Sequence, residues 1–217
     1  KLGDTSLFGS STSSLLSGGS AGEAAAAAAA ASTAEKEPSL DEIDITSEAG
    51  IDYSPLRDAL KEGDFKKADD QHRILLIKLA GEGAVKRGWV YFSEAKNMPV
   101  KDLQVMDNLW RAGSKGRFGF TPQREIYNQQ QKQWARFFKR INWTTLTEKE
   151  SVVYRKWPGE FTYSLDAPKG HLPLTNALRG TQLLQALLEH PAFEKASTKK
   201  SIDDVTKQQT ASTNKLF

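Results

Sequence analysis

Apolar side chains recur every three to four residues in four separate stretches between residues 56 and 141. This spacing places them on one face of an α-helix, and such a face has to be buried against other elements. Glycine or proline separates most of the stretches and predicts where helices end. The pattern therefore predicts an all-α fold. The four apolar faces are Leu56 and Leu60; Phe65, Ala68, Leu75 and Leu79; Leu103, Met106, Leu109 and Trp110; and Trp134, Phe137, Phe138 and Ile141.

Both ends of the 217-residue chain lack this pattern. Residues 1–50 contain 11 Ala and 10 Ser, have Phe8 as their single aromatic residue, and carry 8 acidic but 2 basic side chains. Such a segment cannot bury enough apolar surface to offset the entropy lost on ordering. We predict a low-complexity, disordered segment over residues 1–51, one compact helical core over residues 52–193, and a Ser/Thr/Lys-rich extension over residues 194–217.

Local signals predict how individual helices begin and end. Ser54 followed by Pro55 is typical of an N-cap and a first helical position. Asp64 is expected to begin a helix that runs to about Leu79. A last helix is expected from Leu174 to about Leu188, whereas several prolines and glycines predict irregular structure over residues 144–173.

Composition and motifs disfavour several classes of protein. The absence of cysteine excludes disulfides, thiolate metal sites and a cysteine nucleophile. No catalytic or metal-binding motif is present, so we expect neither an enzyme nor a protein-bound metal. The middle of the chain is moderately basic, but no basic run accompanies it, so we expect no nucleic-acid partner. His72 is expected to be packed or surface-exposed, and His171 to make a hydrogen bond that fixes a loop.

Two further segments carry aromatic residues on glycine- and proline-rich backbone. In residues 113–120 a tight turn between helices is expected to place Phe118 and Phe120 in the core. In residues 154–163 the aromatic side chains could equally fill the core or line an apolar pocket. Asn176 and Arg179, one helical turn apart on the predicted last helix, would suit a carboxylate. The two features together are compatible with a flat apolar ligand that has an acidic edge, or with core packing beside a surface arginine.

Several uninterrupted motifs resemble the genomes-uncoupled-four family, in order, across roughly residues 52–193. The motifs are Asp-Tyr-Ser-Pro-Leu-Arg at 52–57, Asp-Leu-Gln at 102–104 with Leu-Trp at 109–110, Gly-Arg-Phe-Gly-Phe at 116–120, and Gly-His-Leu-Pro-Leu-Thr-Asn-Ala-Leu-Arg-Gly at 170–180. The resemblance implies a helical core shaped like a cupped hand. It also implies a protein that binds protoporphyrin IX and Mg-protoporphyrin IX and stimulates magnesium chelatase in chlorophyll biosynthesis, as a non-catalytic activator.

The resemblance also implies which residues meet the porphyrin. Two connectors of the family hold the ligand between apolar walls, and a polar pair meets its propionates. The apolar positions implied here lie before and within the helix at Asp102, and in the aromatic stretch. By similarity the porphyrin-binding residues are Val100, Leu103, Tyr154, Trp157, Phe161, Asn176 and Arg179, with Met98 a further apolar neighbour.

The family's setting supplies the remaining expectations. It implies a protein of the chloroplast stroma whose partner is the large porphyrin-binding subunit of magnesium chelatase. It is also compatible with a peripheral contact with plastid membranes. The low-complexity N-terminal segment fits a plastid-bearing eukaryote in which a transit peptide has been removed. Two alternatives stay open: a helical protein–protein adaptor without a small-molecule ligand, and a carrier of another amphipathic acid such as a fatty acid.

Overall fold

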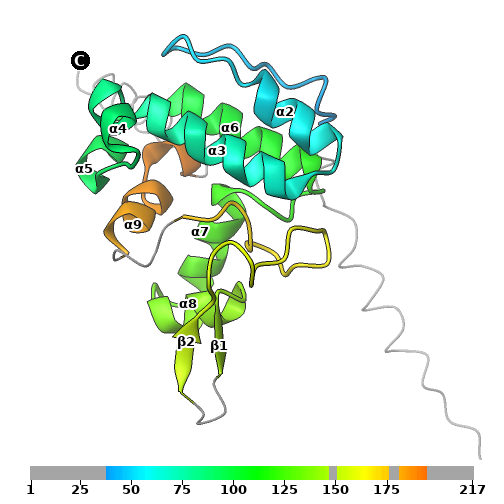
Figure 1. Ribbon diagram of the computed structural model, residues 1–217, viewed down its shortest axis with the longest axis vertical. Helices are drawn as coiled ribbons and strands as arrows, with labels where there is room; N and C mark the ends of the chain where they lie inside the picture. The colour runs from blue at the N-terminus through cyan, green and yellow to red at the C-terminus, as the bar shows by residue number, and fades with distance from the viewer. Residues whose placement is uncertain (1–37, 147–150, 176–180, 195–217) are drawn as a thin grey trace, which may run out of the picture. The chain divides into compact units, whose positions relative to one another are not determined.

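The computed structural model describes residues 38–146, 151–175 and 181–194, and helices account for most of the regular structure within them (Figure 1). A two-stranded antiparallel hairpin pairs Thr144 with Tyr154. The all-α prediction is therefore confirmed. The elements are α2 (Ser54–Lys61), α3 (Phe65–Leu79), α4 (Glu82–Arg87), α5 (Phe92–Ala95), α6 (Val100–Gly113), α7 (Phe120–Gln129), α8 (Trp134–Arg140), β1 (Thr144–Leu146), β2 (Val152–Tyr154), α9 (Gln182–Leu188) and the 3-10 helix η3 (Pro191–Phe193).

Helices α2 and α3 are joined by a short turn at Gly63, whose φ of +70° suits glycine. Asp64 caps α3 as predicted, since its carboxylate accepts a hydrogen bond from the Lys67 N–H at 2.9 Å. The predicted cap at Ser54 is wrong. Ser54 is the first residue of α2, and its own N–H donates to the Asp52 side chain at 2.9 Å.

A buried carboxylate ties the segment before α2 to α6. Asp102 is fully buried, and its oxygens accept hydrogen bonds from the Glu48 N–H at 3.0 Å, the Ala49 N–H at 3.3 Å and the Tyr53 hydroxyl at 2.9 Å. The Ser47 hydroxyl donates to the same carboxylate. The described part of the predicted N-terminal segment, residues 38–51, thus includes a stretch that is bonded to the core.

The Gly-Arg-Phe-Gly-Phe motif has a structural role as the turn from α6 to α7. Phe118 and Phe120 are fully buried, as predicted. The backbone of the turn bonds to the segment at 170–172, with the Gly170 N–H donating to the Arg117 carbonyl at 2.8 Å and the Gly119 N–H to the Leu172 carbonyl at 3.0 Å. Two of the motifs that carry the family resemblance therefore pack directly against each other.

Two sequence-based boundaries in the C-terminal half are wrong. The region predicted to be irregular from residue 144 begins with the β1–β2 hairpin, whose strands are three residues each and too short to show a period. The helix expected from Leu174 does not include Leu174 or Thr175, which are not helical, and α9 as described begins at Gln182. The predicted end of this helix, just before His190, is confirmed.

The core is rich in aromatic side chains, which form two groups. Around α3 and α6, the ring of Phe65 lies 5.5 Å from that of Phe118, and Trp110 packs on both. Around α8, Phe138 stacks on Trp143 at 5.8 Å. None of the helices within the described residues is long and apolar enough to cross a membrane.

Candidate functional site

The predicted connector at residues 154–163 places two aromatic rings at the surface. Tyr154 is the last residue of β2 and is 45% exposed, and its ring centre lies 5.4 Å from that of buried Phe138. Trp157 lies three residues further on and is 47% exposed. Because both rings are already half-exposed, a ligand can stack on them without first breaking their packing in the core.

The backbone that carries these rings is held by side chains on either side. Arg155 donates from its guanidinium to the Asn142 carbonyl at 3.0 Å and to the Asn142 side-chain oxygen at 2.8 Å. The turn that follows is closed by the Glu160 carboxylate, which accepts from the Lys156 N–H at 2.8 Å. The backbone on both sides of Trp157 is therefore held by polar bonds.

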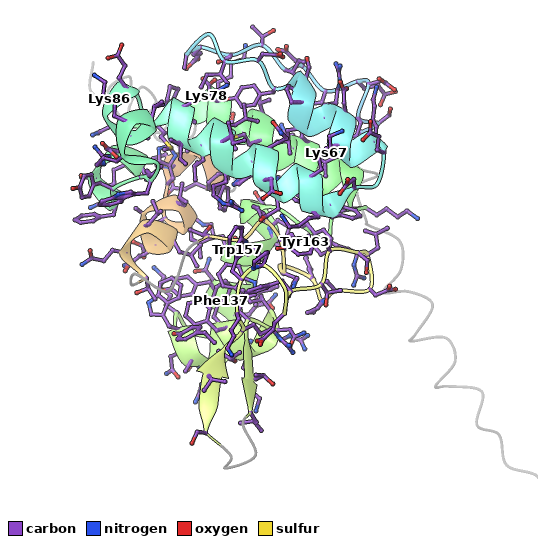
Figure 2. All side chains as sticks on the ribbon, in the orientation of Figure 1. Lys67, Lys78, Lys86, Phe137, Trp157 and Tyr163 are labelled. Carbon is purple, nitrogen blue, oxygen red and sulfur yellow. The ribbon has the colours of Figure 1, made fainter. Side chains whose placement is uncertain are left out.

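Basic side chains of α3 lie against Trp157 and its neighbour Tyr163, both of which are labelled in Figure 2 just below α3. The Arg73 guanidinium carbon is 4.4 Å from the centre of the Trp157 ring. The Lys66 ammonium is 5.7 Å from the Trp157 ring and 5.5 Å from the Tyr163 ring. A flat apolar surface and two cations thus occur together, although Asp69 and Asp70 on the same helix pair with these cations. The half-exposed ring suits an aromatic ligand, and the cations order that ring.

Sequence reasoning missed Lys66 and Arg73 as part of this region. They stand seven residues apart, so they share one face of α3, and the sequence shows this. Nothing in the sequence relates that face to Trp157, since the contact depends on how the connector returns to α3.

The other predicted porphyrin-binding residues differ in how far they are exposed to solvent. Phe161 is half-buried, with its ring 6.3 Å from Trp143 and 5.6 Å from His171, so it packs on the interior side of the connector. Val100 is the first residue of α6 and is 42% exposed, whereas Leu103 is completely buried. Asn176 and Arg179 lie outside the described residues.

A second exposed aromatic group lies on the segment between α4 and α5, before Val100. Trp89 and Tyr91 pack edge to face with ring centres 4.2 Å apart, and Arg87 lies 4.3 Å from the Tyr91 ring. Arg87 is itself bonded to Glu94 at 2.6 Å. Phe92 next to them is 40% exposed. The sequence shows the run Trp-Val-Tyr-Phe at 89–92 as a connector, but four residues are too few to distinguish a strand from a packed loop or to predict exposed rings.

The three histidines are buried and serve the fold. His72 accepts a hydrogen bond from the Trp110 indole at 3.1 Å, and burial lowers the pKa of His72 to about 3. His171 accepts from the Thr162 N–H at 3.2 Å, so its other nitrogen donates to the Ile141 carbonyl at 2.7 Å. The expectation that His171 fixes a loop is confirmed. Within the described ranges, no group of three or more His, Asp or Glu side chains could hold a metal ion.

The comparisons with known proteins cover this same core. A family model described as GUN4-like matches residues 46–191, more than half of the chain. The "Tetrapyrrole-binding protein, chloroplastic" of Arabidopsis thaliana is 49% identical over 148 residues, which make up 66% of this chain and 56% of that protein. The "Ycf53-like protein" of Synechocystis is 41% identical over 149 residues, 69% of this chain and 62% of that protein. The chain thus spans between half and two-thirds of these relatives.

Solved structures agree with the sequence comparisons. The structure of GUN4 from Chlamydomonas reinhardtii aligns with a TM-score of 0.66 at 58% identity, over 72% of this chain and 99% of that one. The ligand-free structure of Arabidopsis thaliana GUN4 aligns with a TM-score of 0.60 at 44% identity, over 67% of this chain and all of that one. The matched residues reach from the segment bonded to Asp102 as far as η3, and by this match the chain belongs to the GUN4-like family.

Proposed function

We propose that this chain is a tetrapyrrole-binding regulatory protein whose ligands are protoporphyrin IX and Mg-protoporphyrin IX. The observation that carries the proposal is the half-exposed pair Tyr154 and Trp157, with Lys66 and Arg73 beside the Trp157 ring. The printed name of the Arabidopsis relative, a tetrapyrrole-binding protein, points to the same class of ligand.

The chemistry of a porphyrin matches these side chains. Its macrocycle is a wide apolar plane, and covering apolar surface contributes about 25 cal/mol per Å² before the costs of ordering are subtracted. Aromatic rings such as Tyr154 and Trp157 stack on such a plane, and the cations that lie against the Trp157 ring hold it in place. In Mg-protoporphyrin the macrocycle nitrogens coordinate the magnesium ion. The metal therefore arrives with the porphyrin, and no side chain of this protein is proposed to coordinate it.

The proposed contacts of the remaining predicted residues follow from their exposure. Val100 offers an accessible apolar side chain at the start of α6, while buried Leu103 supports that wall from behind. Phe161 would support the connector from its interior side in the same way. Asn176 and Arg179, in the segment after Thr175, remain the proposed partners of the propionates.

The proposal extends to the cellular role. We propose that the protein works in the chloroplast stroma, partners the large porphyrin-binding subunit of magnesium chelatase, and stimulates that enzyme in chlorophyll biosynthesis without catalysing a reaction itself. The Arabidopsis relative is named chloroplastic, which supports the location. A peripheral contact with plastid membranes stays a prediction.

A fluorescence titration tests the proposed ligand and site together. Protoporphyrin IX and its Mg form should quench tryptophan emission saturably and shift the Soret band of the porphyrin. Trp157→Ala should weaken binding by about tenfold, the loss expected when a central aromatic anchor is truncated, and Tyr154→Ala by less. Leu165→Ala and Val152→Ala are the matched controls, because Leu165 is 36% exposed just after the connector and Val152 is 68% exposed on the same strand as Tyr154. Both controls should bind as the parent does.

Two outcomes would contradict the proposal. A parent chain that neither quenches saturably nor shifts the Soret band would remove the porphyrin and favour the adaptor hypothesis. A parent that binds equally well after Trp157→Ala and Tyr154→Ala would keep the ligand but move the site. Stimulation of magnesium chelatase, assayed with the same variants, should fall in step with porphyrin affinity.

A further inference from the structure

One face of α3 carries a network of two cations, Lys66 and Arg73, and two carboxylates, Asp69 and Asp70. Lys66 and Asp70 form an ion pair at 2.5 Å, while Arg73 reaches Asp69 at 3.3 Å and Asp70 at 3.2 Å. The spacings of three, four and seven residues place all four side chains on the same side of the helix. The network is graded in exposure, because the Asp69 side chain is fully buried while those of Lys66, Asp70 and Arg73 are each 39% exposed.

The buried end of this network binds the backbone that precedes α9. The Asp69 carboxylate accepts a hydrogen bond from the Leu174 N–H at 2.7 Å, across 105 residues of sequence. A bond from a backbone N–H to a carboxylate is short and about twice as strong as one between neutral groups. Asp69 therefore holds Leu174 against α3.

The exposed end of the network holds the aromatic connector. The Arg73 guanidinium carbon lies 4.4 Å from the Trp157 ring centre, and its bonds to Asp69 and Asp70 restrict where the guanidinium can go. Because two carboxylates already restrict the rotamers of Arg73, little further side-chain entropy is lost when a ring stacks on its guanidinium. One helix face thus contacts both segments that flank the proposed site.

We propose that Asp69 and Arg73 are positioning residues for the tetrapyrrole site: Asp69 fixes Leu174 and orients Arg73, and Arg73 sets the plane of the Trp157 indole on which the ligand stacks. This inference rests on the proposed function. It differs from a direct contact, because both residues act through Trp157 and the backbone at Leu174 rather than by touching the macrocycle. The part of the Trp157 ring that remains exposed is the surface left for the ligand.

The geometry makes binding sensitive to the protonation of Asp69. Burial raises the pKa of Asp69 to about 6, although the Leu174 N–H and Arg73 act in the opposite direction. A neutral Asp69 attracts Arg73 less, so porphyrin affinity should fall as the pH falls through about 6. The charged or titratable groups that act on Asp69, or on which it acts, are Lys66, Asp70 and Arg73 on α3 and Tyr163 on the connector.

The first test replaces Arg73 and compares it with a matched lysine on the same helix. Arg73→Gln should raise the dissociation constant for protoporphyrin IX about threefold to tenfold, the range expected from losing one cation–π contact that orders a ring. Lys78→Gln removes the same charge from an exposed position on the same helix, five residues after Arg73, and should leave the affinity unchanged. An Arg73→Gln chain with the affinity of the parent would overturn the inference.

The second test uses pH as a readout that a merely structural role would not move. Asp69→Asn keeps an oxygen that can accept from the Leu174 N–H but cannot ionise, so its affinity between pH 5 and 8 should lose the step near pH 6 that the parent shows. Titration of the porphyrin's own propionates is common to both proteins and cancels in the comparison. Coincident pH profiles for the parent and Asp69→Asn would overturn the role of Asp69.

A measurement without ligand separates this inference from the proposed function. The emission of Trp157 is obtained as the difference between each protein and the same protein carrying Trp157→Phe. Arg73→Gln should shift that difference spectrum, whereas Lys78→Gln should not. If the parent fails to bind porphyrin but the shift occurs, the positioning of Trp157 stands and the ligand is wrong. If the parent binds and no shift occurs, the ligand stands and the positioning is wrong.

Discussion

Replacing Tyr53 by Phe should have opposite effects on stability in two backgrounds. In the parent, the buried Tyr53 hydroxyl donates to the Asp102 carboxylate at 2.9 Å. A hydrogen bond to a charged group is worth about 1.5–3 kcal/mol, so Tyr53→Phe should lower the free energy of unfolding by about 2 kcal/mol. In a chain that already carries Asp102→Ala, the hydroxyl has lost its charged acceptor and is left beside the Ser47 hydroxyl, whose oxygen already accepts from the Ile51 N–H. Its removal should then raise stability by about 1 kcal/mol.

Asp102→Ala alone should be the most damaging of these changes. It removes the acceptor of the Glu48 and Ala49 N–H groups and of the Tyr53 hydroxyl at once. A loss of about 3–5 kcal/mol is expected, the range for breaking a buried charged network by removing one partner. Asp102→Asn should not rescue it fully, because an amide that accepts from Tyr53 turns its NH2 group toward the two backbone donors.

Urea denaturation of the four proteins measures the coupling between the two residues. The predicted values give a coupling energy of about 3 kcal/mol, at the upper end of what contacting residues show. Equal slopes of the unfolding free energy against urea would confirm that the variants change the native state rather than the compactness of the unfolded one. If Tyr53→Phe changes stability by the same amount and sign in both backgrounds, the hydroxyl has another hydrogen-bond acceptor, and Asp102 is not the partner on which its contribution depends.

Two further predictions concern buried positions. Burial lowers the pKa of His72 from 6.5 to about 3, so below about pH 6.5 the unfolded chain binds a proton that the folded protein excludes, and stability is lost as the pH falls toward 3. His72→Gln, which keeps an acceptor for the Trp110 indole, should lose about 2 kcal/mol less than the parent between pH 7 and pH 5 in urea titrations; equal losses would contradict the assignment. Gly119→Ala should cost about 2–4 kcal/mol, since its φ is +129° and a Cβ there would lie 2.6 Å from Asp107 Oδ1. Gly159→Ala, where a Cβ meets nothing within 4 Å, is the control and should stay within about 0.5 kcal/mol by thermal unfolding.

The helices that could be predicted from the sequence are those with a local reason to begin or end. Asp64 begins α3 because its side chain bonds to an N–H three residues away, and the apolar spacing of α3, α6 and α8 follows one helical face. Helices α4 and α5 are six and four residues long, too short for any period to show. The predicted start of the last helix is wrong for a different reason, since the Leu174 N–H bonds to Asp69 of α3, a contact across 105 residues that local sequence signals do not show.

Sequence and structure also contribute differently to the candidate site. Tyr154 and Trp157 are predicted to bind the porphyrin by resemblance to the family, and the structure places both rings at the surface, which leaves them accessible to a ligand. Leu103 and Phe161 have the same apolar character, but the structure buries the first completely and turns the second toward Trp143. Side-chain type alone does not distinguish an apolar residue that meets a ligand from one that meets the core.

The helical class of this protein, the motifs that place it in its family, and the turn that buries Phe118 and Phe120 all follow from the amino-acid sequence. Each of these depends on residues close together in the chain, through periodicity, caps and glycine turns. The contacts of α3 with the connectors, Arg73 with Trp157 and Asp69 with Leu174, become visible only in the folded protein. Those contacts join residues more than eighty positions apart, and no local preference of the backbone encodes them. They form only when packing of the core brings the connectors back onto one helix face.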